Sequence, residues 1–280
     1  MNTFDYKLLQ EISLPCYDDG KNIIDRSRLD KIEKIATGSD YTYKVSAPLF
    51  TLFSRKPVDA FDDGIVILST HVDAVKEITR FYVKEIDENT IHGTLDNTAT
   101  NAIALSLMLN SSLEERVLIA FTANEEKESL GATQLIEYLK PLNKKIFVIV
   151  LDVTYEGYDS ALFTIENNFF NAEYIHETIK QVILSGNLPF RFIPESYINL
   201  PEYIKFSHLE RYSDGGIIEA LPDESWNYHE LGIECFSLCL PTQGEMHDNC
   251  GVDCKRESFA IYKDMVRDFA NCIACALNKK

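Results

Sequence analysis

Apolar and polar residues follow one another in blocks that predict strands and helices in turn. Three apolar segments predict buried strands at 65–70, where 65–68 are continuously apolar, at 116–123 and at 145–154. Apolar residues at helical spacing predict helices at about 97–110, 129–140 and 171–186. A late strand is expected at 233–241, and a final helix at about 257–278.

Shorter patterns complete this prediction. Residues 1–38 read as helices, 80–97 read as a hairpin that turns at 87–89, and 187–223 read as irregular. Because strands and helices alternate, we expect an α/β fold with a mixed, largely parallel central sheet flanked by helices on both faces. The 280 residues suffice for one large domain, and no change in composition marks a linker. We therefore expect a single catalytic domain over residues 1–280, without a separate lid.

The charge of the chain narrows the classes of partner. The net charge is −17, from 27 basic and 44 acidic side chains. Such a field repels phosphate backbones and anionic lipids, so we expect no nucleic acid and no membrane as partners. The first 15 residues lack the apolar core of a signal peptide, and no apolar run is long enough to cross a bilayer. A cytoplasmic location follows as the expectation.

Seven cysteines are present, and six of them lie in the last fifth of the chain. Their odd number and the missing signal peptide argue against a disulfide framework. Cys272 and Cys275 fall inside the predicted final helix, where we expect them to pack as small apolar residues. The paired CxxC loops of a structural zinc site are missing from the sequence.

Residues with metal-binding or acid–base chemistry follow the predicted strands and the hairpin. Five segments carry them: His71 and Asp73, Asp96, Glu125 and Glu126, Asp152, and His247. Each has an ordinary explanation alone; Asp96 could cap the helix that starts near Asn97, and a Glu pair in a loop is usually solvated. Together they are better explained by a site, because active sites form at the carboxyl ends of parallel strands. Imidazole and carboxylate are ligands that Zn²⁺ accepts.

The ordered set H-x-D, D-N, E-E, D and H resembles the co-catalytic zinc metallopeptidases of the M28, M42 and M20 families. The similar segments cover roughly residues 65–254, and they are STHVDAV, GTLDNTATNAIAL, FTANEEKESLGA, LDVTYEG and LGIECFSLCLPTQGEMH. Residues 72–95 leave no room for an M42-type barrel insertion, and 155–246 are too few for a full M20-type lid. The chain therefore looks most like an M28 member with the zinc aminopeptidase fold.

The resemblance implies two Zn²⁺ ions, which Co²⁺ or Mn²⁺ could replace. One arrangement places His71 and Glu126 with a shared Asp96 on a single ion. The usual arrangement, which we adopt, gives the first ion His71, Asp96 and Asp152. The second ion then takes Asp96, Glu126 and His247.

Further expectations come from the same resemblance. Glu125 is the expected general base, and Asp73 is expected to fix the tautomer of His71. The Asp96–Asn97 peptide bond is expected to be cis. Glu128 departs from the family pattern, which usually has Gly at that place.

The leading hypothesis is a di-zinc aminopeptidase whose Glu general base activates a metal-bridging water. Alternatives are a zinc amidohydrolase of N-acyl amino acids or small amides, and a non-catalytic metal-binding relative, against which the retained Glu125 argues. A one-zinc glutaminyl-cyclase-like transferase is disfavoured because both ligand sets are present. The expected partner is a peptide or small amide, and a homo-oligomer stays open. His229, Tyr228 and Trp226 are candidates for substrate binding, with core packing as the alternative for the last two.

Overall fold

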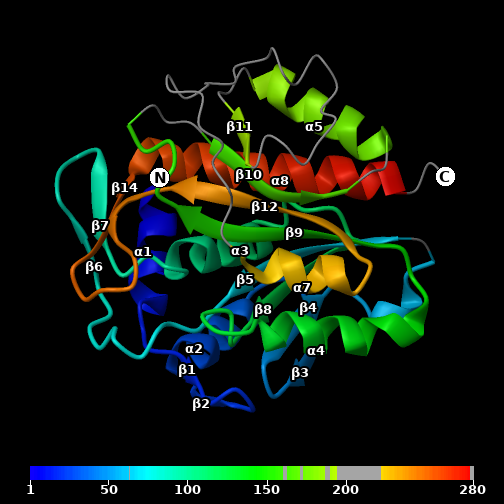
Figure 1. Ribbon diagram of the computed structural model, residues 1–280, viewed down its shortest axis with the longest axis horizontal. Coiled ribbons are helices and arrows are strands. Elements are labelled where there is room, and N and C mark those ends of the chain that lie inside the picture. Colours follow the sequence, from blue (N-terminus) through cyan, green and yellow to red (C-terminus); the bar gives the residue numbers. More distant parts are fainter. Residues whose placement is uncertain (63, 160–162, 171–172, 187–189, 194–221, 278–280) are drawn as a thin grey trace.

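The computed structural model describes residues 1–62, 64–159, 163–170, 173–186, 190–193 and 222–277. An eight-stranded sheet runs through the molecule in the order β11-β10-β12-β9-β5-β8-β4-β3 (Figure 1). Its strands are β3 (Tyr43–Ala47), β4 (Phe50–Ser54), β5 (Ile65–His71), β8 (Val117–Thr122), β9 (Ile146–Thr154), β10 (Phe163–Phe169), β11 (Phe190–Ile193) and β12 (Glu234–Pro241).

The central strands β12, β9, β5 and β8 are parallel to one another, and antiparallel pairs join β10, β4 and β3 to them. This confirms the predicted fold class and the four predicted strands. Strands β3, β4, β10 and β11 were not predicted, because their short mixed patterns do not stand out from those of loops. The expectation of irregular structure over 187–223 is wrong for 190–193, which form β11, and residues 187–189 and 194–221 lie outside the described residues. β5 and β8 are buried at every residue, as expected for strands covered on both faces.

Helices cover both faces of the sheet. The larger apolar cluster joins the sheet to α1 (Thr3–Ile12), α2 (Ser27–Ala36), α3 (Thr98–Leu109), α5 (Glu173–Gly186) and α8 (Arg256–Leu277). The smaller cluster joins the opposite face to α4 (Leu130–Leu139) and α7 (Glu224–Glu230). The helices predicted near 97–110, 129–140, 171–186 and 257–278 are confirmed, with ends within two residues. Short 3₁₀ turns, η1 (Val58–Ala60) and η2 (Lys140–Leu142), complete the helical elements of the described residues.

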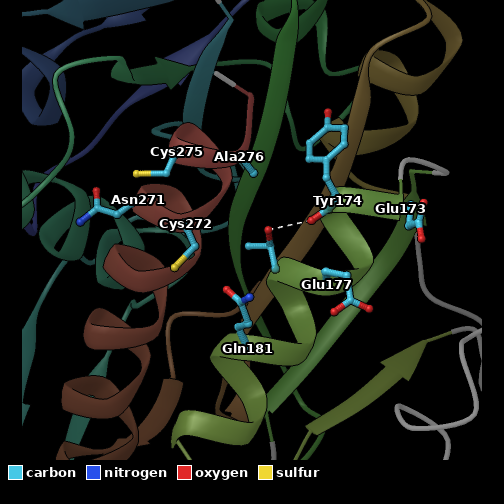
Figure 2. Close-up of a pocket in the computed structure, with 9 residues that line it drawn as sticks. Glu173, Tyr174, Glu177, Gln181, Asn271, Cys272, Cys275 and Ala276 are labelled. Carbon is cyan, nitrogen blue, oxygen red and sulfur yellow. Dashed lines mark hydrogen bonds between the residues drawn. The ribbon is translucent and has the colours of Figure 1, made fainter. Parts of the chain in front are cut away.

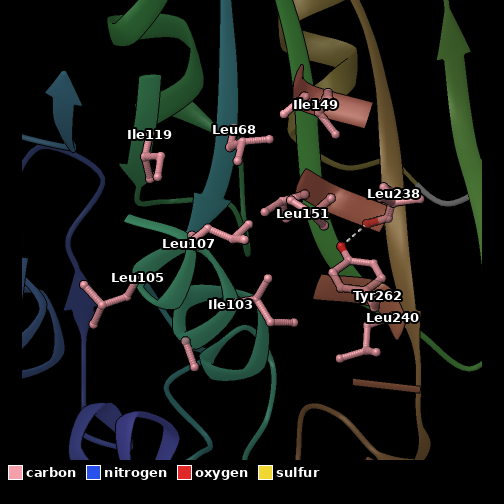
Figure 3. Close-up of a cluster of buried hydrophobic side chains, with 14 of the residues drawn as sticks. Leu68, Ile103, Leu105, Leu107, Ile119, Ile149, Leu151, Leu238, Leu240 and Tyr262 are labelled. Carbon is pink, nitrogen blue, oxygen red and sulfur yellow. Dashed lines mark hydrogen bonds between the residues drawn. The ribbon is translucent and has the colours of Figure 1, made fainter. Parts of the chain in front are cut away.

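Helix α3 is buried along almost its whole length. Figure 3 shows Ile103 and Leu107 of this helix beside Leu68 of β5 and Leu151 of β9. Truncating one such leucine to alanine typically costs about 2–5 kcal/mol. The packing holds the N-terminus of α3 firmly against the ends of the central strands.

The predicted hairpin is present but belongs to a second sheet. Its strands β6 (Val83–Glu85) and β7 (Thr90–Gly93) pair in the order β13-β14-β7-β6 with β13 (Gln243–Glu245) and β14 (Gly251–Lys255). Gly251 has a φ of +76°, and a Cβ there would lie 2.4 Å from the carbonyl oxygen of Gly93. The glycine therefore allows β14 to approach β7, and this brings the loop between β13 and β14 beside the ends of the central strands.

The N-terminal region contains the two predicted helices, α1 and α2, separated by a short pair of strands, β1 (Tyr17–Asp18) and β2 (Ile23–Asp25). Among the described residues, none of the helices combines the length and the apolar character needed to cross a membrane.

Candidate metal centre

All seven residues of the predicted site meet at one edge of the central sheet. His71 ends β5, Asp152 lies near the end of β9, and Asp96 lies two residues before the start of α3. The turn after β8 carries Glu125 and Glu126, and the loop between β13 and β14 carries His247. Parallel strands end at the same edge, which is why residues 176 positions apart come together.

Asp96 lies between the two histidines. Its Oδ1 is 3.2 Å from Nε2 of His71, and its Oδ2 is 3.3 Å from Nε2 of His247. The peptide bond between Asp96 and Asn97 is cis, as the resemblance implied. The ordinary explanation for Asp96 does not hold, because Asn97 is the N-cap residue of α3 and no side chain caps this helix.

The other carboxylates surround these three groups. Oε2 of Glu126 lies 3.4 Å from Nε2 of His247, and Oδ1 of Asp152 lies 3.7 Å from Nε2 of His71. Oε2 of Glu125 is 3.8 Å from the same nitrogen of His71. One ligand atom each from His71, Asp96 and Glu126 lies within 4.8 Å of the other two. Among the described residues this is the one group of three ligand atoms that meets this limit, and it matches the arrangement that places His71, Asp96 and Glu126 on a single ion.

Buried polar groups fix the orientation of His71. Oδ1 of Asp73, which has no exposed surface, lies 3.4 Å from Nδ1 of His71. The other oxygen of Asp73 accepts a hydrogen bond from the backbone N–H of Glu126 at 3.4 Å. Asn101 of α3 donates to the carbonyl oxygen of His71 at 2.7 Å. Asp73 therefore lies against the ring of His71 and Asn101 holds its backbone, which leaves Nε2 facing the carboxylates.

Several buried atoms of this cluster have no hydrogen-bond partner. They are Oδ1 of Asp96, Oε1 of Glu126, Nδ1 of His71 and Oδ1 of Asp73. Burying a polar atom without a partner is costly, so such atoms point to a missing ligand or to a relaxed contact. Imidazole nitrogen and carboxylate oxygen suit Zn²⁺, and the donor set therefore fits a zinc centre.

Burial and mutual charge shift the pKa values of the cluster. Burial raises the pKa of Glu125 well above its ordinary value and that of Glu126 to about 8. Burial alone would lower the pKa of His71, but the surrounding carboxylates raise it well above its ordinary value. A hydrogen bond to Asp96 raises the pKa of His247 to about 9. The cluster therefore holds extra protons in the absence of metal, and cations would displace them.

Arg28 is a buried cation behind the site that the sequence did not reveal. Its side chain has no exposed surface, and it donates to the carbonyl oxygens of Leu14 at 3.0 Å and Val72 at 3.1 Å. Val72 lies between His71 and Asp73, so this contact supports the segment that carries both. In the sequence, Arg28 lies in a charged stretch that resembles any exposed helix face.

The three candidates for substrate binding lie on or beside α7. Tyr228 has no exposed surface, and its hydroxyl is 2.8 Å from Oγ of Ser69. The prediction that Tyr228 lines a substrate pocket is therefore wrong, and the core-packing alternative holds. Trp226 packs edge-on against Phe169, and His229 stacks on the same ring at 4.2 Å. The structure does not bring these two side chains into contact with a metal-site residue within the described part of the chain.

Two cavities lie on different parts of the molecule. A cavity of about 180 Å³ adjoins the site, with Glu126, Lys127 and Lys76 among its lining residues. A larger one of about 480 Å³ lies between α5 and α8, and its lining includes Glu177 of α5 and Cys272 and Cys275 of α8 (Figure 2). Cys272 packs partly against the core, whereas Cys275 is exposed, so the expected apolar packing is correct for the first alone. The larger cavity includes none of the metal-site residues.

Comparison with known proteins identifies the family. The model of peptidase family M28 matches residues 53–192, which is half of the chain. The chain belongs to peptidase family M28. It is therefore a metallopeptidase by family, as the ordered motifs predicted. No curated protein sequence matches this M28 member.

Solved structures agree in fold with this M28 member at low identity. The aminopeptidase APDkam598 from the archaeon Desulfurococcus kamchatkensis has a TM-score of 0.68 at 9% identity, covering 96% of this chain and 94% of its own. A TET aminopeptidase from a marine sediment archaeon of the Thaumarchaeota gives 0.68 at 9% identity, with 95% and 96% covered. The LapA aminopeptidase of Legionella pneumophila gives 0.58 at 13%, with 96% and 71% covered. These likenesses establish the zinc-peptidase fold alone.

Proposed function

We propose that this chain is a di-zinc aminopeptidase that removes amino acids from the N-termini of peptides. The observation that carries the proposal is the position of Asp96, whose two oxygens face two different histidines. A single carboxylate in this position can bridge two ions about 3.5–4 Å apart. The single-domain organisation over residues 1–280 is part of the proposal.

His71, Asp96 and Asp152 would hold the first ion, and Asp96, Glu126 and His247 the second. When bound, the ions supply a water of lowered pKa and polarise the scissile carbonyl. With metal bound, Nδ1–H of His71 would donate a hydrogen bond to Asp73, 3.4 Å away, and this would keep Nε2 available as a ligand.

Glu125 is the proposed general base. It lies beside the ligands, and only 13% of its side chain is exposed. Its raised pKa favours acceptance of a proton from water and donation of that proton to the leaving amine. The adjacent Glu126 faces His247, so the two neighbouring carboxylates divide the tasks of base and ligand.

Acidic residues around Asp152 favour a substrate with a free amino group. Burial raises the pKa values of Asp152 and Asp223 above their ordinary values and that of Glu166 to about 7, and the charge of Asp223 adds to the rise for Asp152. A buried excess of carboxylate is stabilised by a cation. An N-terminal ammonium supplies one, whereas an N-acyl amino acid does not. The aminopeptidase names of the structural neighbours support the same choice.

A panel of substrates tests this proposal. Metal-loaded protein should hydrolyse aminoacyl-anilides, lose this activity on chelation, and regain it when Zn²⁺ or Co²⁺ is added. N-acetyl amino acids should be cleaved at least tenfold more slowly. Faster cleavage of the N-acetyl amino acids would show that the protein is an amidohydrolase instead. Bound metal without hydrolysis of either the anilides or the N-acetyl amino acids would show that it is a non-catalytic relative.

The assembly state is a separate part of the proposal. The TET1 peptidase of Pyrococcus horikoshii, a structural neighbour with a TM-score of 0.65 at 10% identity, can assemble into a tetrahedron or a large octahedral shell. A homo-oligomer of this chain is the corresponding proposal, and light scattering would measure it.

A further inference from the structure

The second sheet carries a chain of polar contacts that ends on the loop between β13 and β14. Nδ1 of His92 on β7 lies 2.6 Å from Oδ1 of Asp253 on β14, and its Nε2 lies 3.0 Å from the hydroxyl of Tyr82. The same hydroxyl lies 2.7 Å from the carbonyl oxygen of Cys250. Cys250 follows His247 by three residues in that loop. The contacts therefore connect the sheet to the segment that carries the exposed histidine of the metal centre.

The number of protons in this chain of contacts decides which hydrogen bonds form. The ionised carboxylate of Asp253 can only accept, so Nδ1 of His92 carries the proton between them. When His92 is neutral, its Nε2 is an acceptor, and the single hydroxyl proton of Tyr82 can go to Nε2 or to Cys250 but not to both. When His92 is charged, Nε2 donates to the hydroxyl oxygen, and the hydroxyl proton is free for Cys250. Only the charged form of His92 satisfies all of these contacts at once.

Charged groups on the neighbouring elements act on His92 in opposite directions. Asp253 of β14 attracts a positive charge on His92, whereas Lys84, its partner across β6 and β7, repels one. Burial raises the pKa of Tyr82 above its ordinary value, so the hydroxyl keeps its proton. Histidine is the side chain that ordinarily changes its charge between about pH 5 and 8. Among the described residues, the other titratable or charged groups around these contacts are Arg80, Asp248, Cys250 and Tyr158.

We propose that Asp253, His92 and Tyr82 form a positioning relay for the loop between β13 and β14. When His92 gains a proton from solvent, the hydroxyl proton of Tyr82 turns from Nε2 to the carbonyl oxygen of Cys250 and fixes the loop. When His92 loses that proton, the two acceptors share the hydroxyl proton, and the loop opens more often. The effect on the metal centre rests on the proposed function, in which His247 of this loop binds the second ion.

Hydrogen exchange of the metal-free protein measures the opening of the loop. Mass spectrometry would follow the amides of residues 246–251 at about pH 5.5 and about pH 7.5, with each rate corrected for the intrinsic rate at that pH. Other groups also titrate, including Glu126, whose pKa burial raises to about 8. The measure is therefore the ratio of protection in the wild-type protein to protection in His92→Gln, whose amide does not titrate. This ratio should be about two- to tenfold higher at the lower pH, the range that one hydrogen bond supplies.

Two tyrosine variants separate the relay from a merely structural role. Tyr82→Phe keeps the ring but removes the hydroxyl, so it should lower protection most at the lower pH and abolish the pH step. Tyr155→Phe is the matched control, because the hydroxyl of Tyr155 accepts from the N–H of Met246 at 3.0 Å, at the other end of the same loop. Among the described residues, Tyr155 has no hydrogen bond to a histidine. This control should lower protection equally at both pH values and keep the step.

Metal binding then connects the relay to the proposed function. The affinity for the second Zn²⁺ should fall about two- to tenfold in Tyr82→Phe, with the first ion bound as in the wild-type protein. Isothermal titration calorimetry would measure this.

A protection ratio that is equal at the two pH values, or a step that disappears in Tyr155→Phe as well, overturns the relay. If the step is present but no second ion binds, the relay is supported and the proposed role of His247 fails. If two ions bind and the step is missing, the proposed function is supported and the relay is wrong. The two conclusions can therefore fail separately.

Discussion

The two halves of the metal centre differ in burial and in what holds them. The half around His71 is formed by the ends of central strands, and only 3% of the side chain of His71 is exposed. The half around His247 is completed by a loop, and 61% of the side chain of His247 is exposed. Asp96 belongs to both halves.

The half around His71 is formed before any ion binds, whereas the half around His247 is assembled from loops. In the buried half, strand packing fixes the ligands before any ion binds, and the low dielectric strengthens their attraction for a cation. In the exposed half, the geometry depends on contacts between loops. We therefore expect the ion beside His71 to bind more tightly than the ion beside His247.

The largest expected effect is a loss of kcat without a loss of metal from either half of the site. Glu125→Gln removes the proposed base but none of the proposed ligands, so kcat should fall by about 10²–10⁴-fold with both ions retained. Steady-state kinetics together with elemental analysis would measure this. Hydrolysis at the wild-type rate would show that Glu125 is not the base.

Removing one histidine from each half tests the comparison directly. His71→Ala leaves buried carboxylates without their partner and should lower the free energy of unfolding by about 2–5 kcal/mol. His247→Ala should lower the free energy of unfolding by only about 1 kcal/mol, because solvent screens its pairing with Asp96 and Glu126, while losing the second ion. Urea unfolding of metal-free protein measures both. Equal destabilisation by the two variants would contradict the asymmetry.

Asn249 supports the exposed half and offers a smaller, sharper test. Its Oδ1 accepts hydrogen bonds from the N–H groups of Thr79 and Arg80, both at 2.9 Å, and its Nδ2 donates to the carbonyl oxygen of Glu77 at 2.9 Å. Asn249→Ala should weaken the second ion about 10–100-fold, as supporting residues typically do, and leave the first unchanged. Isothermal titration calorimetry with Zn²⁺ would resolve the two steps.

Asn271→Ala is the matched control for Asn249. Asn271 likewise bridges backbone groups, accepting from the N–H of Glu114 at 2.7 Å and donating to the carbonyl oxygen of Ser112 at 3.0 Å. It lies on α8 and contacts none of the metal-site residues. Asn271→Ala should bind both ions with wild-type affinity. If it also binds the second ion more weakly, the loss of affinity in Asn249→Ala reflects general destabilisation.

The smallest expected effect is the pH dependence of the metal-free protein. The pKa of Glu126 rises from 4.5 to about 8 on folding, and that of His247 from 6.5 to about 9. Between these values the folded chain binds more protons than the unfolded chain, so stability falls as pH rises from about 6 to 9. Solvent screens the charge of His247, whose side chain is 61% exposed, so the change should be about 1 kcal/mol or less.

Metal should remove this pH dependence, because bound ligands have already lost their protons. Thermal unfolding at pH 6 and pH 9, with and without Zn²⁺, would measure it. If the metal-free protein became more stable between pH 6 and pH 9, the raised pKa values of Glu126 and His247 would be contradicted.

The sequence predicted the central strands and the ligands because both follow local rules. Apolar runs mark buried strands, and the polar residues that end them mark the active edge. The supporting contacts follow no local rule: Arg28 reaches Val72 across 44 residues, and Asn249 reaches Thr79 across 170. Tyr228 was predicted wrongly for the same reason, because nothing near it in the sequence reveals that its hydroxyl contacts Ser69, 159 residues away.

The central claim is that Asp96 joins two ions in one site, and counting bound ions by native mass spectrometry tests it most directly. After loading with Zn²⁺ and removal of excess metal, the wild-type chain should carry two ions and Asp96→Ala should carry none or one. A wild-type chain with a single ion, or an Asp96→Ala variant that keeps both, would contradict the account.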